Sequence, residues 1–355
     1  MRKYLVYILI LVLFSNCKKE VPKYIDEYTE PYTPTLVELE LPWRFPQMPI
    51  PADNPFTKEG IELGRHLFYE KSLSGDNTIS CGSCHKPSAG YSDSRRFSVG
   101  IDNIQGDRQA MPIMNIGWGR KFFWDGRANS LEELVIEPLE NPIEMHETWK
   151  NALTKLKGID KYPDMFRRAF PNEKMDSLTA AKAIAQFMRT LISGNSKFDR
   201  VVRNEIRLTP QEDRGRFLFL SDSGADCFHC HSLGTIMFTD FSFRNNGLDS
   251  VLTDLGLGGV TGSPNDYGEF KVPSLRNWAY TAPYMHDGRF ATMDEVIDHY
   301  STGVKANSPN INIDMQLKDA GGARLTPAER ADLMAFLLTL NDSSFLTNPD
   351  FQDPN

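Results

Sequence analysis

Four of the five cysteines in this chain stand in two copies of one pentapeptide, Cys-x-x-Cys-His, with one copy in each half of the 355 residues. The two thiols of such a motif can add to the vinyl groups of a haem as thioethers, and the histidine that follows is placed to bind the iron. The sequence therefore predicts two covalent c-type haems. The residues expected to hold them are Cys81, Cys84, His85, Cys227, Cys230 and His231.

Two other uses of the cysteines compete with haem attachment. A zinc site needs four Cys or His ligands that converge on one ion, and it does not require a histidine directly after each Cys-x-x-Cys pair. A disulfide framework is less expected still, because a chain of this length can build a core without covalent staples. The repeated histidine favours haem over both.

Composition and charge set the broad class of the protein. With 40% hydrophobic and 24% charged residues, the chain has the composition of a globular protein and is long enough for two domains. Its formal net charge of -8 argues against binding to nucleic acid. The same charge leaves a small basic electron carrier as a plausible partner.

The chain begins with features of an exported protein. Two basic residues precede an apolar run over residues 4–14, which is too short to span a bilayer comfortably and is typical of a signal-peptide core. Cys17 follows a sequence similar to a bacterial lipoprotein cleavage box, so residues 1–17 are expected to be a signal peptide whose cysteine receives lipid. A plain signal peptide with a coincidental thiol is the alternative.

Export agrees with haem attachment, because bacteria complete c-type attachment outside the cytoplasm. We therefore expect a periplasmic protein that meets the membrane only through a lipid on Cys17. Residues 18–54 are rich in proline and are predicted to form an extended tether.

The remainder of the chain contains an internal duplication. Gly64–Phe68 precedes the first haem motif and the similar Gly215–Phe219 precedes the second. Amphipathic helices are predicted over residues 184–191 and 333–340, and the segments that begin at Thr209 and Thr326 have the pattern of a capping box with proline at the first helical position.

Strand patterns are sparse, so the fold class is mainly α. The repeated order of helix, haem motif, loops and helix resembles the cytochrome c fold, which implies two tandem cytochrome c-like domains that each carry one haem. The expected parts are a first haem domain over residues 55–200, a second over 201–342 and a tail over 343–355.

Five short stretches, together with the two haem motifs, carry a resemblance to a known family: Asp53–Pro55, Leu63–Arg65, Phe123–Arg127, Val272–Asn277 and Thr281–Gly288. Through them the chain resembles bacterial dihaem cytochrome c peroxidases and MauG over roughly residues 50–342. The resemblance implies that the first haem reacts with hydrogen peroxide and that the second relays electrons from a small cytochrome c or cupredoxin, so that peroxide is reduced to water.

Three positions near the first haem decide how it would treat peroxide. Glu144 matches the distal glutamate of the family, and a carboxylate there can move a proton between the two oxygens of peroxide. Ile101 stands where many family peroxidases have a distal histidine, so the iron should stay open unless His66 or His146 substitutes. Leu134 replaces a glutamine of the family. The other acids nearby are expected to be solvated: Glu132, Glu133, Glu137 and Glu140.

Two further residues follow from the resemblance. Trp124 corresponds to the tryptophan between the two haems, although core packing is the commoner task of a tryptophan. Tyr300 occupies the position of the second axial ligand of the second haem, as in MauG, and a tyrosinate there would stabilise ferric iron. Met285 is the alternative ligand, and Met293 and His299 are chemical competitors.

The resemblance also implies a calcium ion between the domains, with Gln109, Thr281 and Pro283 at the matching positions, although the family has asparagine where this chain has Gln109. The expected function is the peroxidase. The alternative is a MauG-like oxidase that modifies residues of a partner protein, and a non-enzymatic electron carrier comes third. Ile101 and Tyr300 favour the oxidase. A homodimer is also left open.

Overall fold

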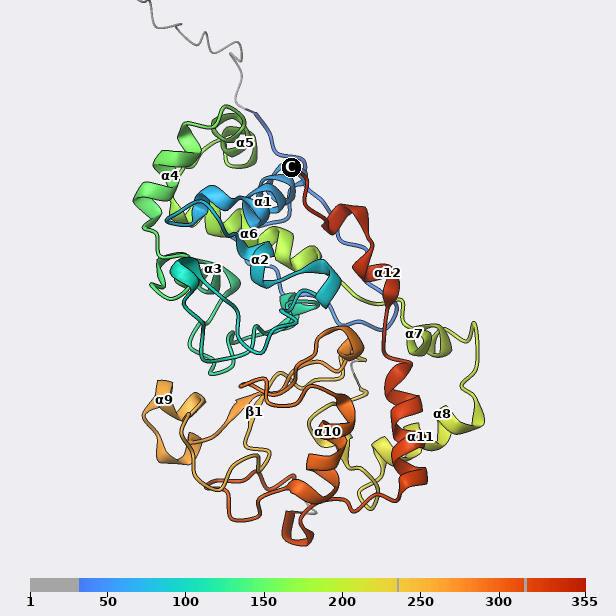
Figure 1. The fold of residues 1–355 in the computed structure, drawn as a ribbon. Helices are drawn as coiled ribbons and strands as arrows, with labels where there is room; N and C mark the ends of the chain where they lie inside the picture. Colours follow the sequence, from blue (N-terminus) through green and yellow to red (C-terminus); the bar gives the residue numbers. More distant parts are fainter. Residues whose placement is uncertain (1–31, 235, 316–317) are drawn as a thin grey trace, which may run out of the picture. The chain divides into compact units, whose positions relative to one another are not determined.

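Figure 1 shows the computed structural model of the chain, which describes residues 32–234, 236–315 and 318–355. The predicted signal peptide, Cys17 and residues 18–31 of the predicted tether lie outside the described residues. From Thr33 to Asn355 the chain is continuously packed, so its two halves can be described together. No helix among the described residues is long and apolar enough to cross a membrane.

Helices account for most of the regular structure, as the sequence predicts. The first half contains α1 (Lys58–Tyr69), α2 (Cys81–Cys84), α3 (Leu131–Glu140), α4 (Trp149–Lys157), α5 (Lys161–Ala169) and α6 (Ser177–Thr190). The second contains α7 (Lys197–Val202), α8 (Pro210–Leu220), α9 (Leu257–Thr261), α10 (Met293–Asp298), α11 (Pro327–Leu338) and α12 (Ser343–Leu346). Two short strands, β1 (Phe243–Arg244) and β2 (Phe270–Lys271), pair antiparallel with Phe243 opposite Lys271.

The two predicted capping boxes are present and start equivalent helices. Thr209 caps α8 and Thr326 caps α11, and in each case the threonine side chain accepts from the backbone amide of a glutamate that in turn accepts from the threonine amide. Proline occupies the first turn of both helices, where its missing N–H has no cost. Each cap is worth about 1 kcal/mol of helix stability.

Each half is organised around one pair of tightly packed helices, α1 with α6 and α8 with α11. The repeated glycine lies where the helices approach. A Cβ on Gly64 would overlap the backbone carbonyl of Ala183, and a Cβ on Gly215 would overlap that of Asp332. Only glycine permits this separation at both positions, so the sequence repeat corresponds to a repeated helix contact.

One pair of aromatic rings packs at each of these two helix contacts, with the same geometry. Phe68 and Phe187 meet edge to face with ring centroids 5.3 Å apart, and Phe219 and Phe336 do so at the same 5.3 Å. Edge-to-face pairs of this kind add about 0.5–1.5 kcal/mol beyond the area that they bury. All four side chains are buried.

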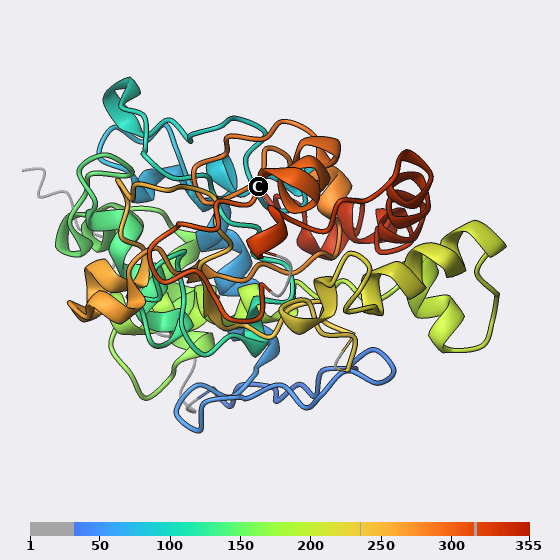
Figure 2. The same cartoon turned by 90° about the horizontal axis from the view of Figure 1, so that it is seen from below.

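The N-terminal segment that was expected to be part of a tether lies against the second core. Phe45 and Met48 are each 8% exposed and belong to the apolar cluster of the second half. The indole Nε1 of Trp118 donates to the carbonyl of Pro46 at 2.9 Å, and the Phe45 ring meets Trp118 edge to face. Residues 33–54 therefore do not form a free extended tether, and Figure 2 shows them running along the edge of the molecule.

The tail over residues 343–355 follows the second half in sequence but packs on the core of the first half. Phe345 and Phe351 belong to the apolar cluster of the first half. The hydroxyls of Tyr69 and Tyr91 both donate to the carbonyl of Phe351, at 2.6 and 2.7 Å. Each end of the described chain thus completes the core of the other half.

The predicted boundary between residues 200 and 201 falls inside α7. Phe198 of this helix meets Phe238 and Phe336 of the second core at 5.4 and 5.5 Å. Asp199 forms a buried ion pair with Arg276, with oxygen–nitrogen distances of 2.6 and 2.9 Å. Helix α7 therefore packs with the second half.

Candidate functional site

The first haem motif lies at the wall of a cavity of about 820 Å³. Helix α2 carries Cys81 and Cys84, both of which are free and line this cavity. The Nδ1 of His85 lies 3.0 Å from the carbonyl of Tyr91, and because a carbonyl only accepts, Nδ1 carries the proton. Burial lowers the pKa of His85, so the ring is neutral and its Nε2 is the nitrogen that can bind iron.

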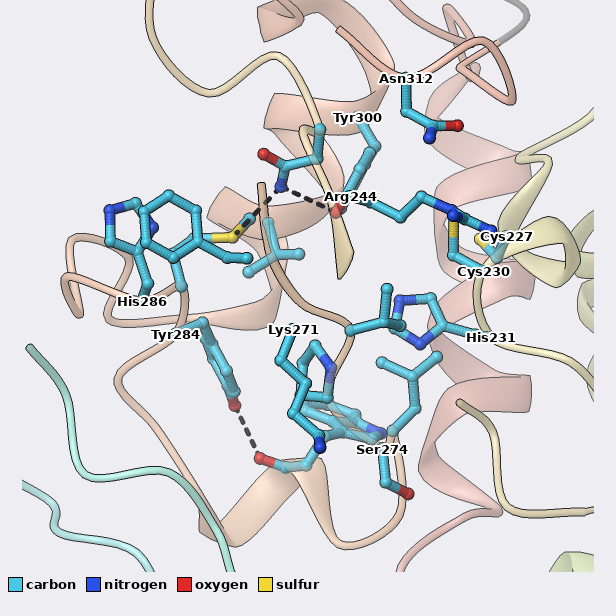
Figure 3. A pocket seen from close by; sticks show the side chains of 18 of the residues that line it. Cys227, Cys230, His231, Arg244, Lys271, Ser274, Tyr284, His286, Tyr300 and Asn312 are labelled. Atoms are coloured by element: carbon cyan, nitrogen blue, oxygen red, sulfur yellow. Dashed lines mark hydrogen bonds between the residues drawn. The ribbon is translucent and has the colours of Figure 1, made fainter. Parts of the chain in front are cut away.

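The second haem motif repeats this arrangement at a smaller cavity of about 190 Å³. Cys227, Cys230 and His231 line it, and Figure 3 shows their side chains together on one side. The Nδ1 of His231 donates to the carbonyl of Phe238 at 3.1 Å, and burial lowers the pKa of His231. Both motifs thus present two free thiols and one oriented neutral imidazole, which fits covalent haem attachment.

The same residues do not fit a zinc site. Within the part of the chain that the structure describes, the one cluster of three metal-ligating side chains consists of Asp222, Asp226 and His229. It contains no cysteine. A structural zinc site needs four converging ligands, commonly thiolates, and neither Cys-x-x-Cys pair lies in such a set.

Glu144 lines the first cavity, as the sequence predicts. Its Oε1 accepts from the side-chain amide of Asn141 at 2.7 Å. Burial raises the pKa of Glu144 above its ordinary value of 4.5, against the opposing effects of the Asn141 hydrogen bond and the charge of Arg127. A carboxyl group with a raised pKa that is held by a neutral amide can both take up and release a proton.

The histidines considered as substitutes for a distal ligand lie elsewhere. His66 contacts Asn355 at the surface and His146 is exposed. Neither lines the first cavity, and His85 is the one histidine among its described lining residues. Ile101 is buried beside Glu144, and its backbone amide donates to the Glu144 carbonyl at 2.9 Å. Leu134 lines the cavity where the family has an amide side chain.

A chain of ion pairs follows the wall of the first cavity and joins the two halves. Arg108 pairs with Asp254 of the second half at 2.8 Å and with Asp125 at 2.6 Å. Arg127 pairs with Asp125 at 3.1 Å and with Glu137 at 2.7 Å. Because Arg127 lies close enough to influence Glu144, this chain connects the second half electrostatically to the expected proton-transfer group.

Two of the acids expected to be solvated are in fact paired. Glu137 belongs to the ion-pair chain, and Glu132 binds the guanidinium of Arg189 at 2.8 Å with a side chain that is only 13% exposed. Glu132 also accepts from Asn54 at 2.6 Å. The sequence prediction was wrong for Glu132 because the helix that carries it packs its first turn against α6.

Trp124 lines both cavities and is 8% exposed. Its Nε1 donates to the carbonyl of Gln109 at 2.8 Å, and its own carbonyl accepts from the amide of Lys271 at 2.9 Å. The indole is therefore fixed between the two places where the haems are expected.

Lys271 also lines both cavities, and sequence reasoning missed it. Its ammonium group contacts the carbonyl of Lys121 and lies 5.2–5.9 Å from the ring centroids of Phe122, Phe241 and Phe243. Burial lowers the pKa of Lys271 to about 8. Among the described residues it has no carboxylate partner, so this buried cation fits the carboxylates that a haem brings with it.

Tyr300 and its rival Met285 both line the second cavity. They share one partner, because the side-chain amide of Asn246 donates to the Tyr300 hydroxyl at 3.1 Å and contacts the Met285 sulfur at 3.7 Å, as the dashed lines of Figure 3 mark. Met293 lines the same cavity. The Nε2 of His299 lies 3.2 Å from the carbonyl of Asn246, outside the described lining.

The three residues at the expected calcium positions come together although they are far apart in sequence. Gln109, Thr281 and Pro283 all line the second cavity. The amide nitrogen of Gln109 donates to Ser92 and to the carbonyl of Asp93, at 2.7 and 3.1 Å.

Several residues of the site escaped sequence reasoning. Asn141 stands in the same short stretch as Glu144, so its partnership could have been found from spacing. Arg108, Asn246 and Lys271 act across long sequence separations, and single charged or amide residues carry no pattern that marks them.

Comparisons with known proteins agree with this geometry. A profile of the family described as di-haem cytochrome c peroxidase matches residues 58–207. The methylamine utilization protein MauG of Methylorubrum extorquens is 37% identical over 313 residues, 86% of this chain and 85% of that protein. The cytochrome-c peroxidase IdrP1 of Pseudomonas sp. strain SCT is 32% identical over 336 residues, 86% of both chains.

A solved structure supports the same assignment. The crystal structure of a MauG-like protein associated with microbial copper homeostasis superposes with a TM-score of 0.83 at 35% sequence identity, covering 90% of this chain and 99% of that one. Both the sequence and the fold, with its tandem cytochrome c-like domains, are thus shared over nearly the whole length. The chain belongs to the di-haem cytochrome c peroxidase/MauG family of oxidoreductases, which implies two c-type haems.

Proposed function

We propose that this protein is a peroxidase that reduces hydrogen peroxide to water with electrons from a small cytochrome c or cupredoxin. The observation that carries the proposal is the position of Glu144, a carboxyl group with a raised pKa in the cavity of the first haem motif. The haem held by the first motif would supply the iron at which peroxide is reduced, and the haem held by the second would supply electrons to it.

Glu144 would act as the proton carrier. Cleavage of the O–O bond requires that one oxygen of the peroxide lose a proton and that the other gain one, so that water leaves, and Glu144 is the group placed to carry this proton. The hydrogen bond from Asn141 orients the carboxyl group for both transfers. The reaction consumes two protons and two electrons for each peroxide and releases two molecules of water.

Trp124 would assist electron transfer between the two cavities. Its indole lines both and is held by hydrogen bonds at the ring and at the backbone. These bonds support a role in which the ring keeps one position beside both cavities.

The negative charge of the chain favours a basic electron-donor protein as the partner.

A MauG-like oxidase that modifies residues of a partner protein is the second candidate. Tyr300 favours it, because its hydroxyl lies in the second cavity with an amide donor, and a tyrosinate ligand would stabilise higher oxidation states of that iron. A non-enzymatic electron carrier is the third candidate, and that function would not require the carboxyl group of Glu144.

Replacement of Glu144 tests the proton carrier. E144Q keeps the size of the side chain but removes the acid, and we expect a loss of about 10²-fold in the rate of reaction with peroxide. In the unmodified protein the rate should rise as pH passes through the raised pKa of Glu144, and in E144Q this rise should vanish. The matched control is E62Q, at an exposed glutamate of α1. Equal rates for E144Q and E62Q would refute the assignment.

Turnover separates the candidate functions. The peroxidase consumes a reduced small cytochrome c on addition of peroxide, which visible absorbance records. If the cytochrome stays reduced while mass spectrometry finds oxidised residues in a partner protein, the oxidase is correct instead. Two low-spin ferric haems in electron paramagnetic resonance, with no high-spin signal and no peroxide reaction, would establish the carrier.

We also propose a periplasmic location with a lipid on Cys17, and a calcium ion bound near Gln109, Thr281 and Pro283. The lipid is tested by mass spectrometry of the mature N-terminus and by release of C17A from membranes. Calcium is tested by metal analysis of the purified protein. A chelator should also lower the thermal stability of the protein, and added calcium, but not magnesium, should restore it.

A further inference from the structure

Asn246 lies between the two side chains that compete for the second haem. Its Nδ2 is 3.1 Å from the Tyr300 hydroxyl oxygen and 3.7 Å from the Met285 sulfur. All three residues line the cavity that contains Cys227 and His231. One amide group therefore holds both candidate ligands at once.

The position of Asn246 is fixed by its surroundings. Its carbonyl accepts from the Nε2 of His299 at 3.2 Å. The next residue, Gly247, has φ of 71° and its carbonyl accepts from the amide of Lys305, while its own amide donates to the side chain of Asn245 at 2.9 Å. These bonds hold the backbone of Asn246 and Gly247 in place, so the Asn246 side chain starts from a fixed point beside the cavity.

Tyr300 is held with similar firmness. It lies in a π-helical turn over His299–Gly303 at the end of α10, a conformation that is uncommon and is frequent at functional sites. Its carbonyl accepts from the amide of Ala323 at 2.9 Å. The hydroxyl can then meet Asn246 without a change of backbone.

We propose that Asn246 is a positioning residue that selects Tyr300 over Met285 as the axial ligand of the second haem and raises the reduction potential of that haem. An N–H donor stabilises an anionic oxygen and withdraws charge from it, which weakens its preference for ferric iron. The contact of the same amide with the Met285 sulfur keeps the thioether aside. The inference rests on the proposed ligand role of Tyr300 and deepens it.

The reduction potential of the second haem in the holoprotein tests this assignment. M285L is the background for this test, because it leaves no thioether that could replace Tyr300. N246L/M285L removes the donor at nearly constant size, and relative to M285L we expect about a tenfold shift of the reduction equilibrium toward ferric iron, which is ~59 mV for one electron. N312L/M285L is the matched control, because Asn312 lines the same cavity and its side chain accepts from the Asp314 amide instead. N246D/M285L, which replaces the donor by an anion, should shift the equilibrium in the same direction and serves if N246L/M285L does not fold.

Electron paramagnetic resonance of the ferric protein supplies the second readout. A low-spin signal typical of thioether ligation that appears in N246L and disappears in N246L/M285L would support the selection of Tyr300 by Asn246. An unchanged signal in N246L together with an unchanged potential in N246L/M285L and N246D/M285L, with a changed signal in Y300F, would overturn the role of Asn246 alone. An unchanged signal in Y300F would overturn the inference at its premise, whereas the peroxidase proposal is judged separately by cytochrome turnover.

Discussion

The indole Nε1 of Trp124 donates to the backbone carbonyl of Gln109 at 2.8 Å. Both residues line both cavities, so the bond anchors the ring at the place where the two cavities adjoin the same residues. W124F keeps an aromatic ring but loses this bond and raises the energy needed to remove an electron. We expect slower electron transfer between the haems, seen by stopped-flow absorbance after peroxide, and a stability loss of about 1 kcal/mol.

The control for this change is W43F, because Trp43 is 54% exposed and lies outside both cavities. It should leave the kinetics unaltered. Normal transfer rates in W124F would show that the tryptophan only fills space.

The buried ion pair between Asp199 and Arg276 is expected to be costly to break. The two side chains are 3% and 0% exposed. D199N leaves a guanidinium charge buried and should cost about 3–5 kcal/mol in the free energy of unfolding. The comparable pair of Arg214 and Asp332 has an arginine that is 61% exposed, so D332N should cost at most about 1 kcal/mol. Chemical denaturation measures both, and equal losses would contradict the burial argument.

The same pair predicts a dependence of stability on pH. Burial alone would raise the pKa of Asp199, but the hydrogen bonds and charge of Arg276 outweigh it and lower the pKa below its ordinary value of 3.8. A lowered pKa in the folded state gives stability that is present above the ordinary value and is lost as pH falls through the folded value. Thermal unfolding from pH 5 downward should therefore show a smaller acid-induced loss in D199N than in the unmodified protein.

The repeated glycines should be equally intolerant of a side chain. A methyl group on Gly64 or Gly215 would overlap a backbone carbonyl of the facing helix, so G64A and G215A should each destabilise the fold by about 1–3 kcal/mol. At Gly259 the nearest atom to a new Cβ is 3.8 Å away, and G259A should be neutral or slightly stabilising. Calorimetry of the three variants compares them directly; a neutral G64A would mean that the helices can separate without loss.

The tail should stabilise the first half from the far end of the chain. Phe345 is 3% exposed within the first core, and F345A is expected to cost about 3–5 kcal/mol. Phe217 is 69% exposed, and F217A should stay within about 0.5 kcal/mol of the unmodified protein. Because Phe345 packs beside Tyr91, whose carbonyl holds His85, the loss should also alter the absorbance of the first haem.

The sequence allowed the helical repeat and the haem ligands to be predicted, because both depend on local patterns. Thr209 and Thr326 mark helix starts through residues three positions away, and each Cys-x-x-Cys-His motif is complete within five residues. These features need no knowledge of the fold.

The remaining features depend on contacts between distant segments. The proline content of residues 33–54 suggested an extended tether, but Phe45 and Met48 find a hydrophobic surface that exists only after the second half has folded. Asn246 meets Tyr300 across more than fifty positions, and no periodicity connects them. Glu132 looked solvated because its partner Arg189 lies on another helix.

The exchange of terminal segments between the halves has a consequence for dividing the chain. The first core contains Phe345 and Phe351 of the tail, and the second contains Phe45 and Met48 of residues 33–54. Two polypeptides made by cutting the chain between the halves would each lack part of their own interior, so neither haem module should fold as well alone as it does in the whole protein.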